Sequence, residues 1–122
     1  MQTRNGQVSS DKLAKLIVKG MQEKKAHDIV VLNLKEIKNA IADYFVVCSG
    51  TSDTQLSAIS ESIDEEVFKI SRQSPWHKEG LTNKEWILLD YVDVVAHIFL
   101  HDKREYYALE NLWGDVMTTP AK

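Results

Sequence analysis

The 122-residue sequence has few of the features that cross-link a chain or anchor it in a membrane. Its single cysteine, Cys48, cannot form a disulfide within the chain, which agrees with a reducing compartment. No apolar run approaches the roughly 20 residues of a membrane span. The first ten residues also lack the apolar centre of a secretory signal. We therefore expect a cytoplasmic protein.

Signatures of several common functions are missing as well. The formal charge of −3 disfavours broad binding of nucleic acid through a basic surface. Neither phosphate-binding pattern, G-x-x-x-x-G-K or G-x-G-x-x-G, occurs, and there is no G-x-S-x-G nucleophile elbow. A hydrophobic content of 43% with 27% charged residues is typical of a soluble globular domain. The composition therefore predicts one globular domain and does not require an enzyme.

Hydrophobic periodicity predicts two helices and two strands before Pro75. A helix follows the N-cap candidate Ser9, and the runs 28–34 and 43–49 have the length and content of fully buried strands. A turn at 49–53 leads into a longer helix that ends before Pro75. The apolar stripes are Leu13, Leu16, Ile17 and Met21 in the first helix, and Leu56, Ile59, Ile63, Val67 and Ile70 in the second.

The stretch 86–113 predicts a hairpin that leads directly into a helix. The runs 86–91 and 94–101 are rich in β-branched residues, whereas strong helix formers follow Asp102, a candidate N-cap. Residues 76–85, which precede the hairpin, contain a turn at Gly80 and can form a further short strand. Alternation places Trp86, Leu88 and Asp90 on one face of the first hairpin strand, and separates His97, Phe99 and His101 from Ala96, Ile98 and Leu100 on the second.

These elements predict a single α/β domain with a mixed sheet of four to five strands and helices packed mainly on one face. We expect the domain to cover residues 9–116. Residues 1–8 and 117–122 carry no pattern and are expected to be flexible ends. Inside the second predicted strand, Cys48 is expected to be a small buried hydrophobe rather than a reactive thiol.

The last predicted helix carries the clearest candidate binding residues. Turning each residue by about 100° places Arg104 and Tyr107 on its outer face, opposite the apolar stripe. Tyr and Arg are the side chains that most often anchor protein interfaces, although a tyrosine can also simply lie along its own helix. Phe68, away from the stripe of its helix, is a second candidate surface aromatic for self-association.

Three polar constellations leave alternatives open. Asp90 and Asp93 could hold magnesium, make polar contacts to a partner or cap the hairpin turn. The glycine turn at 49–53 could bind an anion at a helix N-terminus or serve as an ordinary cap. His97 and His101 would lie about 13 Å apart along one strand, too far to share a metal ion. We expect neither a metal nor a cofactor.

Three separated motifs in this order resemble the ribosomal silencing factor RsfS, or Iojap-like, family. They are ADYFVVCSGTSDTQ at 42–55, WILLDYVDVVAHIF at 86–99 and REYYALENLW at 104–113, with the Gly80 turn between the first two. The likeness covers nearly the whole chain after Asp11. The hairpin turn of the family usually reads D-x-G-D, whereas Val92 stands in the glycine place here, and valine resists positive φ.

The resemblance implies a binding protein and not a catalyst, with a nucleotidyltransferase-like fold that lacks that activity. It implies binding to the large ribosomal subunit through its protein number fourteen, which blocks joining of the small subunit and represses translation when nutrients are short. It also implies a homodimer when the protein is free, with no DNA or membrane partner. The contact residues that it implies are Trp86, Asp90, His97, Arg104, Tyr107 and Glu110.

An alternative hypothesis is a nucleotidyltransferase-like protein that binds nucleotides. It would use Ser49 and Gly50 for phosphate, and Asp90 with Asp93 for a metal ion. In such enzymes a D-x-D pair follows closely after the glycine turn, and the sequence from Gly50 to Pro75 contains none. The two hypotheses differ in whether magnesium-dependent nucleotide binding or a change in ribosome profiles is observed.

Overall fold

The computed structural model describes residues 8–82, 84–102 and 118–120, and two helices and six strands lie within these ranges. The helices are α1 (Ser10–Glu23) and α2 (Asp53–Ser71). Neither of these two is long and apolar enough to cross a membrane. The strands are β1 (His27–Asn33), β2 (Tyr44–Gly50), β3 (His77–Glu79), β4 (Trp86–Asp90), β5 (Val94–Leu100) and β6 (Thr118–Pro120).

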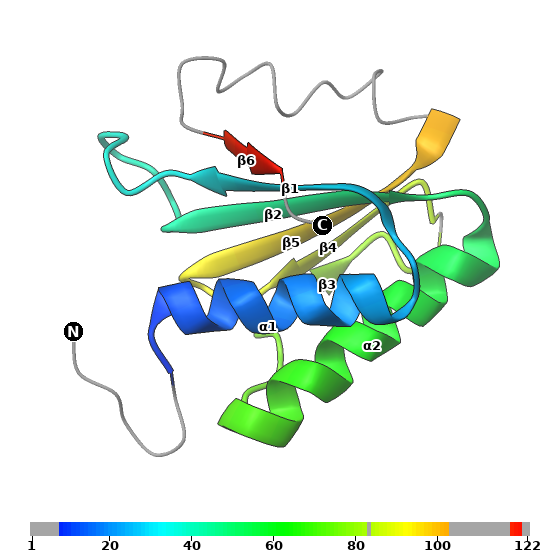
Figure 1. Cartoon of the computed structure of the whole chain (residues 1–122), viewed down its shortest axis with the longest axis horizontal. Coiled ribbons are helices and arrows are strands. Elements are labelled where there is room, and N and C mark those ends of the chain that lie inside the picture. Colours follow the sequence, from blue (N-terminus) through cyan, green and yellow to red (C-terminus); the bar gives the residue numbers. More distant parts are fainter. Residues whose placement is uncertain (1–7, 83, 103–117, 121–122) are drawn as a thin grey trace.

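The strands form one mixed sheet in the order β3-β4-β5-β2-β1-β6 (Figure 1). β2 and β5 run parallel, with Tyr44 opposite Val94, and every other neighbouring pair is antiparallel. The predicted mixed sheet is confirmed, since β1 to β5 are the expected strands. Three residues of the tail expected at 117–122 behave differently, because Thr118–Pro120 pair with β1 as an edge strand.

The two helices lie together over one face of the sheet, as predicted (Figure 1). Ser9 caps α1 by accepting a hydrogen bond from the Lys12 N–H. The helices approach closely at Gly20, where a Cβ atom would lie 2.7 Å from the Cα of Ile63. The hydroxyl of Ser62 also donates to the Gly20 carbonyl at 2.8 Å. A side chain at position 20 would therefore force the helices apart.

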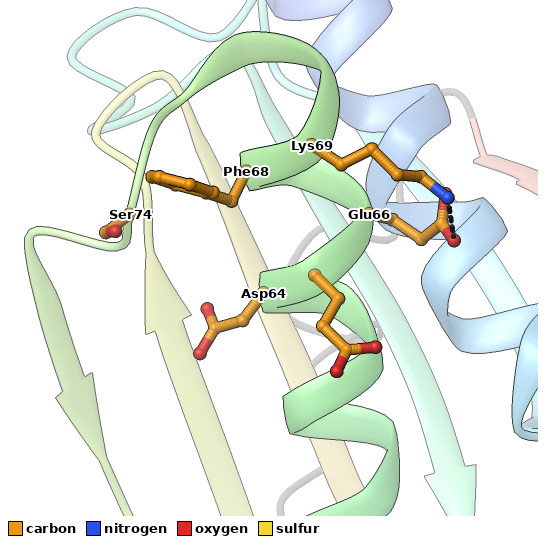
Figure 2. Close-up of a pocket in the computed structure, with 6 residues that line it drawn as sticks. Asp64, Glu66, Phe68, Lys69 and Ser74 are labelled. Carbon is orange, nitrogen blue, oxygen red and sulfur yellow. Dashed lines mark hydrogen bonds and ion pairs between the residues drawn. The ribbon is translucent and has the colours of Figure 1, made fainter.

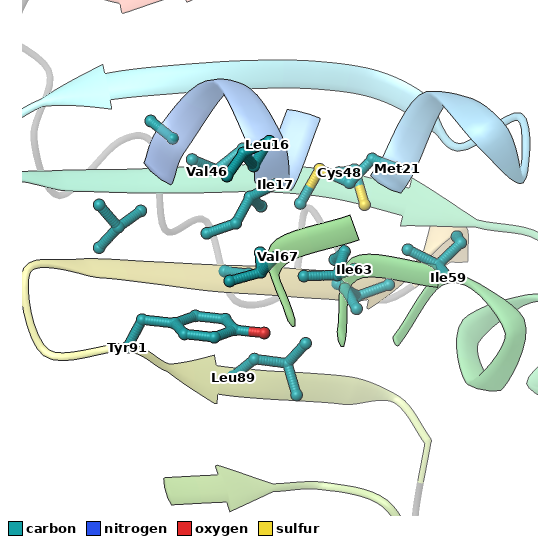
Figure 3. Packing of buried hydrophobic residues seen from close by; sticks show 14 of the residues in the cluster. Leu16, Ile17, Met21, Val46, Cys48, Ile59, Ile63, Val67, Leu89 and Tyr91 are labelled. Atoms are coloured by element: carbon teal, nitrogen blue, oxygen red, sulfur yellow. The ribbon is translucent and has the colours of Figure 1, made fainter. Parts of the chain in front are cut away.

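The main core fills the space between the helices and the sheet (Figure 3). The predicted stripe of α1 is buried, and so are four of the five residues predicted for α2. Ile70 was wrongly assigned to the core, since half of its side chain is exposed in the last turn of α2. Cys48 is fully buried in this cluster, as predicted. The buried members from the helices are Leu13, Ala14, Leu16, Ile17, Met21, Leu56, Ile59, Ile63 and Val67.

A second cluster covers part of the opposite face of the sheet. The connection from β1 to β2, which has no sequence pattern, contributes Leu34, Ile37, Ala40 and Ala42 to it. The prediction that both early strands are fully buried holds for β2 from Phe45 onward and is wrong for β1, which has exposed and half-buried positions. The buried members of this cluster are Leu32, Leu34, Ala42, Phe45, Val47, Val95 and Phe99, with Trp86 and Leu88 packed against them.

Two parts of the predicted architecture lie outside the described residues. The backbone is helical at His101 and Asp102, where the last helix was predicted to begin, and the description stops there until residue 118. The expected flexible start at 1–8 is described only at Val8. The proposed domain limits therefore remain a prediction.

Candidate partner-binding surface

Trp86 lies on the sheet face that the helices leave open. The alternating burial of β4 separates Trp86, Leu88 and Asp90, all half-buried, from the buried Ile87 and Leu89 on the helix side. The indole stacks on Phe99 of β5 with ring centroids 5.1 Å apart. Trp86 is therefore part of the second cluster and is also partly accessible from outside.

His97 lies beside Trp86 and is almost completely buried, with 3% of its surface exposed. The Trp86 Nε1–H donates a hydrogen bond to His97 Nδ1 at 3.0 Å, and the Phe45 ring lies 4.6 Å from the imidazole centroid. Burial lowers the pKa of His97 to about 3, because an apolar environment disfavours the charged imidazolium. His97 is therefore neutral near pH 7.

The hydrogen bond from Trp86 also fixes the tautomer of His97. Nδ1 accepts a proton donor, so the single proton of the neutral ring must be on Nε2. Nε2 is buried and has no hydrogen-bond partner among the residues that the structure describes. A buried donor without an acceptor is unfavourable. An apolar ring at this position would avoid the cost at Nε2, but it would also remove the acceptor that Nδ1 offers to the Trp86 N–H.

Asp90 shares the sheet face of Trp86 and caps the hairpin turn. Its Oδ1 accepts a hydrogen bond from the Val92 N–H at 2.7 Å. Val92 has a φ of +78°, and the Asp93 N–H donates to the Tyr91 carbonyl at 3.0 Å. This i to i+2 bond around a positive φ forms a γ-turn, which is strained for a β-branched residue. Val92 therefore adopts a positive φ that glycine takes up more readily than valine.

The turn is also tied to the rest of the sheet. The Asp93 carbonyl accepts hydrogen bonds from the N–H groups of Asp43 and Tyr44, at 2.7 and 3.3 Å. On the helix side, the Tyr91 hydroxyl donates to Asp64 Oδ1 of α2 at 3.0 Å. Burial, and then the charge of Asp64, raises the pKa of Tyr91 far above its usual value, so its hydroxyl remains a donor. These bonds fix the position of the hairpin end.

The structure thus brings three of the six predicted contact residues to one face of the sheet. Trp86 and Asp90 lie on that face and are half-buried, while His97 is buried beneath it. The other three, Arg104, Tyr107 and Glu110, lie outside the described residues. His101 is exposed beyond the end of β5, so it does not meet His97 in the core.

The turn between β2 and α2 has the geometry of an ordinary cap. Ser52 accepts a hydrogen bond from the Gln55 N–H at 3.1 Å, and the Thr51 N–H donates to Gln55 Oε1 at 2.7 Å. The Gln55 amide in turn donates to the carbonyls of Lys24 and Lys25 after α1. Groups that a phosphate would need at this helix N-terminus are therefore engaged by the protein's own side chains.

A separate hollow of about 520 Å³ lies beside the end of α2 (Figure 2). Phe68, predicted as a surface aromatic, lines it and is 46% exposed. Glu66 forms ion pairs with Lys69 and Lys19, in which its Oε2 and Oε1 lie 3.2 and 3.6 Å from the respective Nζ atoms. Sequence patterns also missed the exposure of Trp76, which is 76% exposed, because a single tryptophan before a short strand has no periodic signal. The other lining residues are Asp64, Glu65 and Ser74.

Polar contacts also join the start of α1 to the sheet. Asp11 Oδ1 accepts hydrogen bonds from the Tyr44 hydroxyl at 2.5 Å and from Lys35 Nζ at 2.9 Å. The bond from Tyr44, and then that from Lys35, holds the pKa of Asp11 below its usual value. This cluster could not be predicted from sequence patterns, because its members are far apart along the chain.

Comparison with known proteins gives the family. A family model described as "Ribosomal silencing factor during starvation" (RsfS) matches residues 7–122. The chain is 40% identical over 115 residues to the ribosomal silencing factor RsfS of Halalkalibacterium halodurans, covering 91% of this chain and 93% of that protein. A mouse protein named "Mitochondrial assembly of ribosomal large subunit protein 1" is 32% identical over 100 residues, which cover 43% of its length.

The fold agrees with this sequence similarity. A crystal structure of a protein from Chromobacterium violaceum superposes with a TM-score of 0.81 at 29% identity, and 88% of each chain is covered. The family model, a relative at 40% identity and the shared fold extend over most of the same residues. The chain therefore belongs to the ribosomal silencing factor (RsfS) family.

Proposed function

We propose that this protein binds the large ribosomal subunit through its protein number fourteen and blocks joining of the small subunit. Translation would fall under nutrient limitation as a result. The observation that carries the proposal is the family match over residues 7–122, to a family described as acting in ribosomal silencing during starvation. The mouse relative, named for the assembly of the large ribosomal subunit, supports the choice of subunit.

The accessible side chains of the hairpin have the chemistry that such a contact needs. Trp86 offers a partly exposed aromatic surface held on a packed sheet, and rigid aromatic anchors are typical of binding hot spots. Asp90 offers a carboxylate at the same face, which suits the basic groups of a ribosomal protein. We propose Trp86 and Tyr107 as apolar anchors, Asp90 and Glu110 as acceptors, and Arg104 as a group that orients the acids or donates to backbone carbonyls.

The mechanism that we propose is steric occlusion without any chemical step. A folded chain of 122 residues has a radius of gyration of about 14 Å. A body of this size, seated on the face of one subunit, would keep the second subunit from closing against it. The effect requires only tight binding, and neither a cofactor nor a bound nucleotide takes part in it.

Separated ribosomal subunits provide the direct test. Purified protein is added to large and small subunits, and the fraction of joined ribosomes is measured on sucrose gradients together with the affinity for isolated large subunits. We expect joining to decrease, and we expect Trp86→Ala and Tyr107→Ala to weaken binding about thirtyfold or more, since hot-spot truncations cost at least about 2 kcal/mol. Phe68→Ala is the matched control, because this exposed aromatic belongs to the helix layer.

Two outcomes would contradict different parts of the proposal. Unchanged joining in the presence of saturating protein would refute subunit silencing itself. Normal joining inhibition by both Trp86→Ala and Tyr107→Ala would leave the function standing and refute this contact surface. Binding to purified protein number fourteen alone, measured by calorimetry, tests the identity of the partner.

The resemblance to the family also leads us to propose that the free protein is a homodimer. Light scattering coupled to size exclusion gives the mass in solution, which should be twice the 13.9 kDa of one chain. A mass of one chain at micromolar concentration would rule out a stable dimer.

A further inference from the structure

The hydrogen bond between Trp86 and His97 connects the accessible surface to the interior. Trp86 lies opposite Phe99 in the sheet, and His97 lies opposite Leu88, so the two side chains meet diagonally across neighbouring strands. The indole N–H points to a ring that is buried below it, at 3.0 Å from Nδ1. The indole is therefore partly exposed, whereas the imidazole is buried in the core.

An indole on a packed surface needs such an acceptor to keep one orientation. The indole N–H is a donor only, and a half-buried donor without an acceptor is unfavourable. Stacking on Phe99 favours contact with that ring but leaves the direction of the N–H edge open. His97 Nδ1 supplies that direction, because the rings of Phe45 and Phe99 pack on the imidazole at 4.6 and 6.3 Å.

His97 also has a feature that stability alone does not explain. Its Nε2–H is buried without a partner among the described residues, and an apolar ring of similar size would avoid this penalty. The imidazole is neutral near pH 7, so Nδ1 is free to accept and the site carries no charge. Among ring side chains, only a neutral histidine combines an acceptor with this shape.

We propose that His97 is a positioning residue of the docking surface: its Nδ1 holds the indole of Trp86 in the orientation offered to the partner, and His97 itself does not touch the partner. This inference rests on the proposed function. It assigns His97 a role beneath the surface, in place of the direct contact to the partner that the family resemblance implies.

Two substitutions separate orientation from packing. His97→Asn keeps an acceptor near the position of Nδ1, because both side chains branch at Cγ, but it leaves part of the ring volume empty. His97→Phe keeps the ring and its packing and removes the acceptor. In His97→Phe the unpaired Nε2–H disappears and the Trp86 N–H loses its acceptor, so we expect a stability in urea close to that of the wild type, with binding to large ribosomal subunits about tenfold weaker. We expect His97→Asn to be less stable, yet to bind within about threefold of the wild type.

A spectroscopic measurement reports on the bond itself. The Trp86 indole N–H signal in a 15N-labelled protein should exchange slowly with solvent in the wild type and in His97→Asn. In His97→Phe it should exchange fast or shift to the position of an indole without a partner. Because the variant expected to lose stability, His97→Asn, is not the variant expected to lose affinity, His97→Phe, a role in packing alone would not reproduce this pattern.

A double-mutant cycle provides a measurement that does not depend on the folding of the asparagine variant. If His97 acts only through the indole N–H, adding His97→Phe to Trp86→Phe should weaken binding no further. The positioning role would be overturned if the affinity losses of the two single variants simply add in the double variant, or if His97→Phe binds with wild-type affinity. In either case, binding by the wild type would still support the proposed function. No binding of wild-type protein to large subunits would refute the proposed function and this inference with it.

Discussion

Mild acid should destabilise the fold through His97, in a pH range where carboxylates contribute little. The folded protein keeps this imidazole neutral, with a pKa of about 3, whereas an unfolded histidine titrates near 6.5. Between these two values the unfolded chain binds a proton that the folded chain does not bind. The stability due to the neutral ring is therefore complete above pH 6.5 and is lost as the pH falls toward 3.

The size of the effect follows from the two pKa values. At pH 5 about 97% of unfolded chains carry the proton and about 1% of folded chains do. Integration from pH 7 to pH 5 gives a loss of about 2 kcal/mol in the free energy of unfolding. Asp11, whose pKa is lowered by Tyr44 and Lys35, contributes a loss only at lower pH, because its unfolded value is near 3.8.

The assay compares urea unfolding of the wild type and His97→Phe at pH 7 and pH 5, followed by far-UV circular dichroism. We expect the wild type to lose about 2 kcal/mol more than the variant over this range. His27→Asn, at an exposed histidine, is the control and should behave as the wild type does. If His97→Phe and the wild type lose the same free energy, the imidazole is not held neutral by burial and the reasoning is refuted.

Three further substitutions test the packing and the hairpin turn. Gly20→Ala should destabilise the protein by about 1–3 kcal/mol in urea unfolding, because its Cβ would lie 2.7 Å from the backbone of Ile63; a loss below 0.5 kcal/mol would contradict the close helix contact. Val92→Gly should stabilise by about 1 kcal/mol, since relief of a strained positive φ exceeds the added entropy of the unfolded chain; a lower urea midpoint would contradict strain at this turn. Tyr91→Phe should cost about 1–2 kcal/mol by removing the hydrogen bond to Asp64, and an unchanged midpoint would show that this bond contributes nothing.

The helices, the hairpin and the faces of their side chains could be predicted because each depends on local periodicity. The stripe of α1 and the alternation in β4 and β5 follow from repeats of about 3.6 and two residues. The exposure of Ile70 could not be predicted, because the last turn of α2 extends past the core. The hydrophobic pattern of a helix does not reveal where the surface that it packs against ends.

Contacts between distant segments could not be predicted from patterns. The parallel pairing of β2 with β5 brings together residues about fifty positions apart, and no local signal sets this register. The hydrogen bond from Trp86 to His97 depends on the register between β4 and β5. Both residues could be identified as candidates from the sequence, but the burial and the tautomer of His97 could not. Strand β6 could not be distinguished from a flexible tail, because three residues are too few to show a period.

In the described part of the chain, the hairpin of β4 and β5 contains two unfavourable features. Each of them belongs to a residue that holds a surface side chain, Asp90 or Trp86, in place through a hydrogen bond. Val92 adopts a strained positive φ while its N–H satisfies Asp90, and His97 leaves a buried donor unpaired while it accepts from Trp86. Asp90 and Trp86 are the half-buried groups proposed to meet the partner. Since strain and unsatisfied groups tend to persist where function requires them, their position in the hairpin of β4 and β5 supports, independently of sequence similarity, the proposal that this face of the sheet meets the partner.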